Sequence, residues 1–425
     1  MTLLMIGIMT LIGFGMPIAF ALLVPCALYF VAAGLPETIF AQRVASGTAS
    51  FPLLAIPLFV LAGEIMGRGG IASRLIDVAQ VAVGHMRGGL AQVGVIGGAL
   101  ISAISGSATA DTAILAKTVS KEMVREGYPR GFAAAVAASA GVLGPMIPPS
   151  IMMILYGLMA EVSIGRLFIA GVLPGLVIAA ALMIANRLVM RQHKIDIPLR
   201  PKASRADLVA SIKRGFWALL FPVLVWVGLR GGFFTPTELG AFVALYCLLV
   251  SVFIYKEIKL SELPGILQES ALLTAIILFI LAASSGLNYA IAWERLPQAI
   301  AGWFLTVSDN KYVILLIINV LLLVLGLALE GPPLLIILTP ILVPLMTSLG
   351  VDLVHFGVIL TLNLTLGALT PPVATLIFVA STIVGCSSSE FMKYFGTIFG
   401  VLLVALLIIT FVPGLSLFLP WLLYG

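Results

Sequence analysis

The sequence predicts an all-α polytopic membrane protein with inverted repeats, each containing a re-entrant hairpin and a broken transmembrane helix. Three observations support this fold class. Of the 425 residues 61% are hydrophobic and only 10% charged, whereas soluble domains carry roughly 25% charged residues. Apolar runs near the ~20 residues that cross a bilayer recur from end to end, such as YVILLIINVLLLVLGLALE at 312–330. Breaks rich in Gly, Ser and Pro interrupt these runs in two matched pairs.

The N-terminal region 1–87 is predicted to form scaffold helices. It has no Lys or Arg before Arg43, so it lacks the basic segment of a cleaved signal peptide and is interpreted as beginning with a retained helix. The three cysteines, Cys26, Cys247 and Cys386, lie far apart in or beside apolar stretches. This spacing indicates small core residues and favours neither a disulfide nor a metal site.

The region 88–160 is predicted to hold the first hairpin and the first broken helix. Its arms, 88–104 and 108–122, are separated only by SGS around Gly106, and each arm is too short to cross independently. The span at 131–160 is interrupted by GPMIPP from Gly144 onward. The breaking prolines are Pro145, Pro148 and Pro149.

The region 161–308 is predicted to contain scaffold and linking helices around a basic loop. Apolar spans are expected near 164–190, 215–231, 236–255 and 268–287. The loop 187–214 has eight basic and two acidic residues, which by the positive-inside rule predicts a cytoplasmic location. The net charge of +5 therefore has a topological explanation, and we expect no nucleic-acid partner. Adjacent charges at Glu294 and Arg295 followed by Pro297 place 291–307 at the membrane interface.

The region 309–385 repeats this pattern. Its hairpin arms, 312–329 and 334–348, flank EGPP at 330–333, and its broken helix contains LGALTPP, which matches LGPMIPP at an offset of 223 positions. The breaking prolines are Pro333, Pro371 and Pro372. A C-terminal helix is expected over 386–425.

Counting crossings indicates that the two repeats are inverted. The loop 117–130 lies two crossings before the basic loop, which places it in the cytoplasm. Five crossings then separate the first hairpin from the second, and five is odd. The second hairpin should therefore open to the opposite side, provided that 291–307 does not span the membrane.

Broken helices at membrane depth predict a binding site, because unsatisfied backbone groups are tolerated there only when they line a cavity or are buried in protein. Freed carbonyl groups suit a small cation, and half-helix N-termini face anions. One helix end favours an anion by about 0.3–2 kcal/mol, whereas desolvating a carboxylate costs several kcal/mol. An anionic solute should therefore travel with sodium ions or protons. A single Gly or Pro is equally well explained by a kink; four breaks in matched pairs favour a site.

Two acidic residues lie at the hairpin tips, and each has two interpretations. Asp111 would cost roughly 2.5–3.5 kcal/mol at mid-membrane without a partner, so it either supports the first cation site or caps the second hairpin arm. Glu330 is either a site acid or a side chain that reaches the aqueous face.

Four segments resemble, in order, the large membrane subunit of the tripartite ATP-independent periplasmic (TRAP) transporters. They are FVLAGEIMGRGGIASRLID, GHMRGGLAQVGVIGGALISAISGSATADTA, GPMIPPSIMMILYG and VSIGRLFIAGVLPGL. The resemblance implies a sodium symporter of the ion-transporter superfamily in the bacterial inner membrane, which imports an acidic organic solute such as a C4-dicarboxylate or sialic acid. It also implies an elevator mechanism, a periplasmic solute-binding protein and a separate small four-helix membrane subunit.

Carried onto this sequence, the resemblance implies a moving block of about 88–160 and 309–385. The expected sodium ligands are Ser105, Gly106, Ser107, Asp111, Gly144, Gly331, Pro332, Gly367 and Thr370. Solute would lie between the tips, with Thr112, Ser150 and Asn363 as candidate contacts. The second tip, EGPP, lacks the hydroxyl groups of the first, so its cation would depend on backbone carbonyl groups.

Three alternatives were weighed. A self-sufficient sodium/dicarboxylate symporter of the same superfamily would share the hairpins and need no binding protein. An intramembrane enzyme is disfavoured because the three histidines are scattered and no H-E-x-x-H occurs. An ATP-driven pump is disfavoured because no G-x-x-x-x-G-K-[ST] is present.

Overall fold

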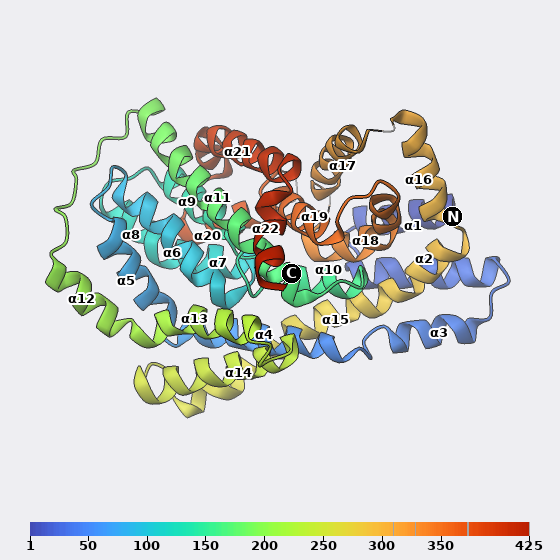
Figure 1. Cartoon of the computed structure of the whole chain (residues 1–425), viewed down its shortest axis with the longest axis horizontal. Coiled ribbons are helices and arrows are strands. Elements are labelled where there is room, and N and C mark those ends of the chain that lie inside the picture. Colours follow the sequence, from blue (N-terminus) through green and yellow to red (C-terminus); the bar gives the residue numbers. More distant parts are fainter. Residues whose placement is uncertain (309, 328, 372–373, 425) are drawn as a thin grey trace.

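The computed structural model describes residues 1–308, 310–327, 329–371 and 374–424, and this part of the chain contains helices and no β-strands. Within these ranges six helices are long and apolar enough to cross a membrane, or seven if one bent pair forms a single span. Pro372, predicted as a helix break, lies outside the described residues. Figure 1 shows helices from both halves of the chain side by side in the centre of the molecule.

The N-terminal helices form an outer layer together with two helices from the middle of the chain. They are α1 (Thr2–Gly13), α2 (Ile18–Ala32), α3 (Glu37–Ser46), α4 (Ala55–Arg68) and α5 (Ile71–Val83). Helix α4 packs against α14 (Pro236–Leu249) and α15 (Leu263–Trp293), and α2 packs along α15. The expected scaffold of 1–87 is thus completed by segments more than 150 residues away.

The first hairpin turns at Gly106 (φ 60°), which ends α6 (Gly89–Ser105). Its second arm starts with α7 (Ala108–Leu115) and continues through a π-helical turn, Ala116–Ser120, into α8 (Lys121–Arg125). The following span is broken: α9 (Arg130–Ala140) runs into a 3₁₀ turn, Gly141–Leu143, and helix resumes only at α10 (Ile151–Met159). The backbone thus turns and breaks at the two positions that the sequence predicts.

The middle of the chain contains α11 (Ile164–Gln192), α12 (Arg205–Arg214) and α13 (Phe216–Arg230), and the chain bends by 69° between α12 and α13. A π-helical turn, Val250–Ile254, extends α14. Helix α15 is longer than the expected span 268–287, so the segment 291–307 is divided. Its first residues end α15, and α16 (Leu296–Val307) follows Arg295, whose φ is 52°.

The second hairpin consists of α17 (Lys311–Gly326) and α18 (Gly331–Ser348), and α19 (Leu353–Gly367) and α20 (Thr375–Val384) flank the second break. The segment 386–425, expected as one helix, forms two, α21 (Ser388–Phe411) and α22 (Gly414–Tyr424). The interruption contains Pro413, which has no amide hydrogen to continue a helix.

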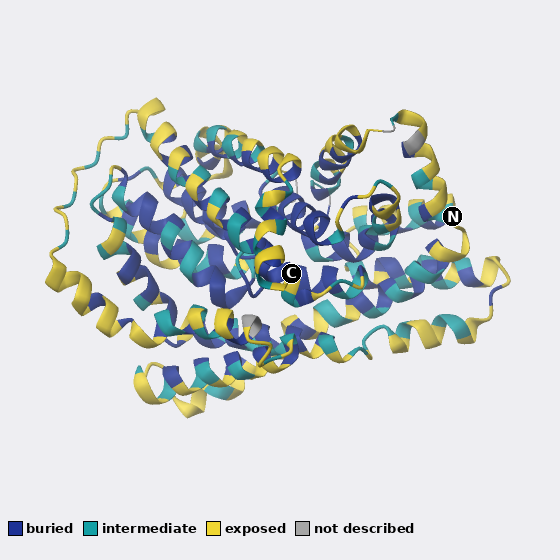
Figure 2. Ribbon diagram, in the orientation of Figure 1, coloured by how far each residue is buried: buried dark blue, intermediate teal, exposed yellow. Residues whose placement is uncertain are grey.

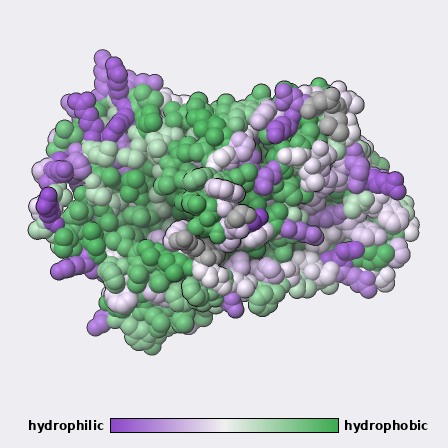
Figure 3. All heavy atoms as spheres, in the orientation of Figure 1, coloured by the Kyte–Doolittle hydropathy of each residue, from purple (hydrophilic) through white to green (hydrophobic). Residues whose placement is uncertain are grey.

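The two broken helices are the innermost elements of the molecule. Every residue of α9 from Gly131 to Ala140, and of α19 from Val354 to Gly367, is buried (Figure 2). A helix that is apolar on all sides is stable only when protein or lipid surrounds it. Outer helices instead expose large apolar side chains, such as Leu3 and Ile6 of α1. Figure 3 shows a broad hydrophobic area between hydrophilic ends of the molecule, as expected for a surface in contact with lipid.

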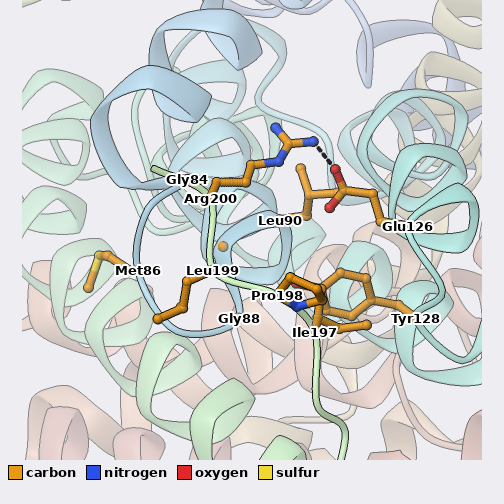
Figure 4. A pocket seen from close by; sticks show the side chains of 11 residues that line it. Gly84, Met86, Gly88, Leu90, Glu126, Tyr128, Ile197, Pro198, Leu199 and Arg200 are labelled. Atoms are coloured by element: carbon orange, nitrogen blue, oxygen red, sulfur yellow. Dashed lines mark hydrogen bonds and ion pairs between the residues drawn. The ribbon is translucent and has the colours of Figure 1, made fainter. Parts of the chain in front are cut away.

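The basic loop includes an extended connector, residues 193–204, that lies across the base of the first hairpin. Figure 4 shows Arg200 of the connector paired with Glu126, beside Ile197, Pro198 and Tyr128. Arg200 also lies 3.9 Å from Glu122. The connector is therefore held to the hairpin by charge at its basic end and by apolar packing in its middle.

Candidate functional site

The tip of the first hairpin packs directly against the first helix break. A Cβ atom added at Gly106 would lie 2.4 Å from the carbonyl oxygen of Pro149, and one added at Gly144 would lie 2.8 Å from the carbonyl carbon of Ser107. Both glycines are needed because backbone approaches backbone at these points. The tip residues 105–107 and the break at Gly144 are therefore neighbours.

Asp111 lies fully buried at this contact. Its carboxylate accepts hydrogen bonds from Ser105 and, at 2.7 Å, from Ser102. A Cβ at Gly144 would lie 2.8 Å from Asp111 Oδ2, so the carboxylate also faces the break. The capping interpretation of Asp111 is wrong: Ser107 is the N-cap of α7, and its hydroxyl accepts from the amide of Ala110. A residue four positions into a helix points sideways from its end, which is why Asp111 reaches α6.

The second hairpin meets the second break through the end of its first arm. Gly326, at the end of α17, and Gly367, at the end of α19, face each other so closely that a Cβ on Gly326 would lie 2.8 Å from the Cα of Gly367. Beyond Gly367 the chain forms a turn in which the amide of Thr370 donates to the carbonyl oxygen of Gly367 at 2.9 Å. The Thr370 hydroxyl donates to the carbonyl oxygen of Leu366, also at 2.9 Å.

A cavity of about 460 Å³ lies between the two tips. This volume is within the range of ligand pockets. It is lined by both tips, by α10, α19 and α20, and by α4 and α15 of the outer layer. Its polar residues include Glu64, Ser105, Ser107, Thr109, Glu330, Thr365 and Thr375. Gly331 and Pro332 of the second tip and Pro145 of the first break also face it.

The three candidate solute contacts lie outside this lining. Thr112 is fully buried and faces Gly141, Ser150 caps α10 by accepting from the amide of Met153, and Asn363 donates to Asn319 Oδ1 at 2.7 Å. Each lies on or beside an element that lines the cavity, but its side chain is buried in the packed interior. In a helix that is apolar on all sides, the sequence has no periodic pattern from which to predict which residues face the cavity.

The remaining predicted break residues occupy turns or helix starts. Pro332 and Pro333 are the second and third residues of α18, where proline is well tolerated, and Pro371 lies exposed in the turn after α19. The bond between Pro148 and Pro149 is cis.

Sequence reasoning missed Glu64 of α4 and Ser102 of α6. Glu64 lines the cavity and lies 4.0 Å from Arg68, one helical turn away. A carboxylate inside the run PLFVLAGEIM is the signal that could have identified it, because acidic residues within apolar spans are rare and commonly functional. Ser102 carries no such signal, since serine is common in membrane helices.

Comparison with known proteins agrees with this arrangement. The family model described as "Tripartite ATP-independent periplasmic transporter, DctM component" matches residues 5–415. The C4-dicarboxylate TRAP transporter large permease protein of Pseudomonas aeruginosa is 40% identical, over 88% of this chain and 87% of its own. The sialic acid TRAP transporter large permease protein of Vibrio cholerae is 36% identical, over 99% and 98% respectively.

A solved structure shows the same fold at greater distance. The YdaH transporter of Alcanivorax borkumensis superposes with a TM-score of 0.61 over 92% of this chain and 89% of its own, with 15% sequence identity. The family match and the apolar helices indicate a multi-pass protein of the bacterial inner membrane. The chain belongs to the DctM component family of the tripartite ATP-independent periplasmic transporters.

Proposed function

We propose that this chain is the solute-conducting subunit of a sodium-coupled importer of an acidic organic solute. The observation that carries the proposal is the cavity between two hairpin tips, with the first tip packed on the first helix break and the end of α17 packed on the second. Relatives named for C4-dicarboxylate and sialic acid transport support the class of solute. Residues of both tips line the cavity, so one bound solute could contact both repeats.

The first cation site is assigned to the contact between the first tip and the first break. Asp111 is a buried carboxylate whose two hydroxyl donors supply no compensating charge, and a buried ion needs a charged partner as well as hydrogen bonds. Carboxylate, hydroxyl and freed backbone carbonyl oxygens are the hard ligands that suit a sodium ion. Ser105, Gly106, Ser107, Asp111 and Gly144 would hold it.

The second cation site is assigned to Gly331, Pro332, Gly367 and Thr370. Its donors would be mainly backbone carbonyl groups, because the second tip contributes no hydroxyl group. Two cations bound nearby would offset the cost of desolvating an anionic solute, which helix ends alone do not offset.

For the transport step we propose an elevator motion of the hairpins and broken helices, residues 88–160 and 309–385, against α1–α4, α14 and α15. Helix α11, expected in the scaffold, packs against α6, α10, α19 and α21. We therefore assign α11 and α21 to the moving block. We propose a cytoplasmic location for the basic loop 187–214, on the basis of the positive-inside rule.

The proposed partners are a periplasmic solute-binding protein and a small four-helix membrane subunit. The decisive experiment is solute uptake into proteoliposomes that contain this chain and the small subunit encoded beside it. We expect uptake only with an inward sodium gradient and the cognate binding protein. Uptake that needs sodium but no binding protein would identify a self-sufficient symporter, and uptake without sodium would overturn the coupling.

A further inference from the structure

We propose that the cavity orients its solute, with the carboxylate at the first tip and hydroxyl groups at the second, where Glu330 accepts their hydrogen bonds. Glu330 would then determine specificity, and the solute would be a hydroxylated monocarboxylate of the sugar-acid class. This inference rests on the proposed function and adds the chemical class and orientation of the solute.

The charge of the cavity lining is the first observation. Among the described lining residues the ionisable side chains are Glu64 and Glu330, with no Lys, Arg or His. Glu64 lies 4.0 Å from Arg68, which also pairs with Glu269. Within the described chain, the Glu330 side chain has no hydrogen-bond or ion-pair partner, and it occupies the N-cap position of α18 without making a capping hydrogen bond. One end of the cavity thus presents an uncompensated carboxylate.

The difference between the two helix starts is the second observation. At the first tip, α7 begins at Ala108, and Ser107 and Thr109, whose hydroxyl groups share a hydrogen bond of 3.1 Å, line the cavity beside it. At the second tip, α18 begins Gly331-Pro332-Pro333, and two of these three residues have no amide hydrogen to donate. The second tip therefore offers fewer donors to an anion, and Glu330 already occupies the positive end of the helix dipole.

These two observations fix the orientation. A solute carboxylate binds where hydroxyl and amide donors are available, at the first tip. At the second tip the Glu330 carboxylate favours hydroxyl groups of the solute as hydrogen-bond donors, because charge-assisted hydrogen bonds are stronger than neutral ones. A second solute carboxylate there would face a like charge, which acts as a repulsive element against dicarboxylates.

The test compares three acids of six carbons: D-gluconate, hexanoate and adipate. The purified complex of this chain with its small subunit is titrated with each acid in sodium buffer, and thermal stabilisation gives the apparent affinity without the binding protein. We expect D-gluconate to bind at least about tenfold more tightly than adipate, with hexanoate between them. Glu330→Gln should reduce this ratio about tenfold, chiefly by strengthening adipate binding.

Two variants control the comparison. Glu161→Gln makes the same charge change at an exposed residue outside the cavity lining and should leave the ratio unchanged. Glu330→Asp keeps the carboxylate and should keep the preference for D-gluconate over adipate. It therefore still tests the assignment if Glu330→Gln fails to fold. A wild-type protein that prefers adipate, or a ratio unaffected by Glu330→Gln, overturns the assignment.

Uptake separates failure of this inference from failure of the proposed function. The natural solute is identified by mass spectrometry of the purified binding protein and supplied to the proteoliposomes with a sodium gradient. Sodium-dependent uptake of a dicarboxylate would support the transport function and overturn the orientation. No sodium-dependent uptake of the natural solute would overturn both.

Discussion

Asp111 and its surroundings show how a single side chain can link the two parts of the candidate site. Its carboxylate binds Ser102 and Ser105 of α6 and faces Gly144 at the first break. Hydroxyl groups stabilise a buried carboxylate but do not neutralise it. The residue is therefore suited to respond to the arrival of a cation.

We predict that Asp111→Asn raises the sodium concentration for half-maximal uptake at least about tenfold, because the amide keeps the shape and removes the charge. The measurement is initial uptake rate against sodium concentration. Asp196→Asn, in the connector, is the matched control and should behave like the wild type. Unchanged sodium dependence in Asp111→Asn would reduce the residue to a structural role.

Gly106 combines two separable requirements, a positive φ and contact with Pro149. Gly385 has a similar φ of 73° but open space around its Cβ position. Alanine at either site costs about 1–2 kcal/mol of backbone strain, and only Gly106→Ala also clashes with backbone. We predict that Gly106→Ala abolishes uptake and Gly385→Ala does not, measured at matched amounts of folded protein. Equal activity of the two variants would contradict the assigned tip contact.

The residues that were predictable from sequence are those whose role is local. Gly106 and the prolines of both breaks can be recognised in the sequence because glycine and proline affect the backbone directly. Thr112, Ser150 and Asn363 lie outside the cavity lining, which was not predictable because their contacts depend on helix rotation and on distant partners such as Asn319. In helices that are apolar on all sides, no periodic pattern reports that rotation.

At the scale of elements, the connector 193–204 has a clear physical role at the base of the first hairpin. Arg200 pairs with Glu126 and lies near Glu122, and the side chains of Arg200 and Glu126 are less than one-third exposed. The pair joins the connector, which leads into α12, to a hairpin that we propose to move. The connector therefore constrains how far the hairpin base can travel from α12.

We predict that Arg200→Glu detaches the connector, because three carboxylates then meet, and that Arg200→Glu combined with Glu126→Arg restores the contact. Limited proteolysis by proteinase K would measure it as faster cleavage within 193–204 in the single variant. The free energy of detaching the connector should fall by about 1 kcal/mol, as for partly exposed ion pairs. Arg205→Glu, at the exposed start of α12, is the control; equal cleavage in it and in Arg200→Glu would contradict the clamp.

At the scale of the whole molecule, the order of hairpin and broken helix in each half was predictable, and the packing of the outer layer was not. Four local breaks in matched pairs identify the repeats. The association of α4 with α14, or of α11 with α21, depends on contacts between uniformly apolar surfaces that carry no positional signal in the sequence. The division of 386–425 into two helices follows from Pro413, a local signal that was present in the sequence.

The inverted arrangement itself makes a prediction about the two hairpin bases. Arg125, 78% exposed at its side chain, ends the first hairpin, and Ser348 ends the second. The five crossings counted from the sequence predict that these residues lie on opposite sides of the membrane. We predict that in a Cys386→Ser background, with Cys26 and Cys247 buried, a membrane-impermeant maleimide added outside spheroplasts labels Ser348→Cys and not Arg125→Cys. In inside-out vesicles the pattern should reverse.

Lys202→Cys, in the connector, is the control for this labelling and should follow Arg125→Cys, because Arg200 holds the connector to the same hairpin base. Labelling of Arg125→Cys and Ser348→Cys from one side would mean that an even number of crossings separates the hairpins, with 291–307 as the first segment to re-examine. The two tips would then enter from the same face. The two repeats would then not be inverted, and they could not exchange roles to give one state that opens outward and one that opens inward. That result would contradict the proposed elevator mechanism.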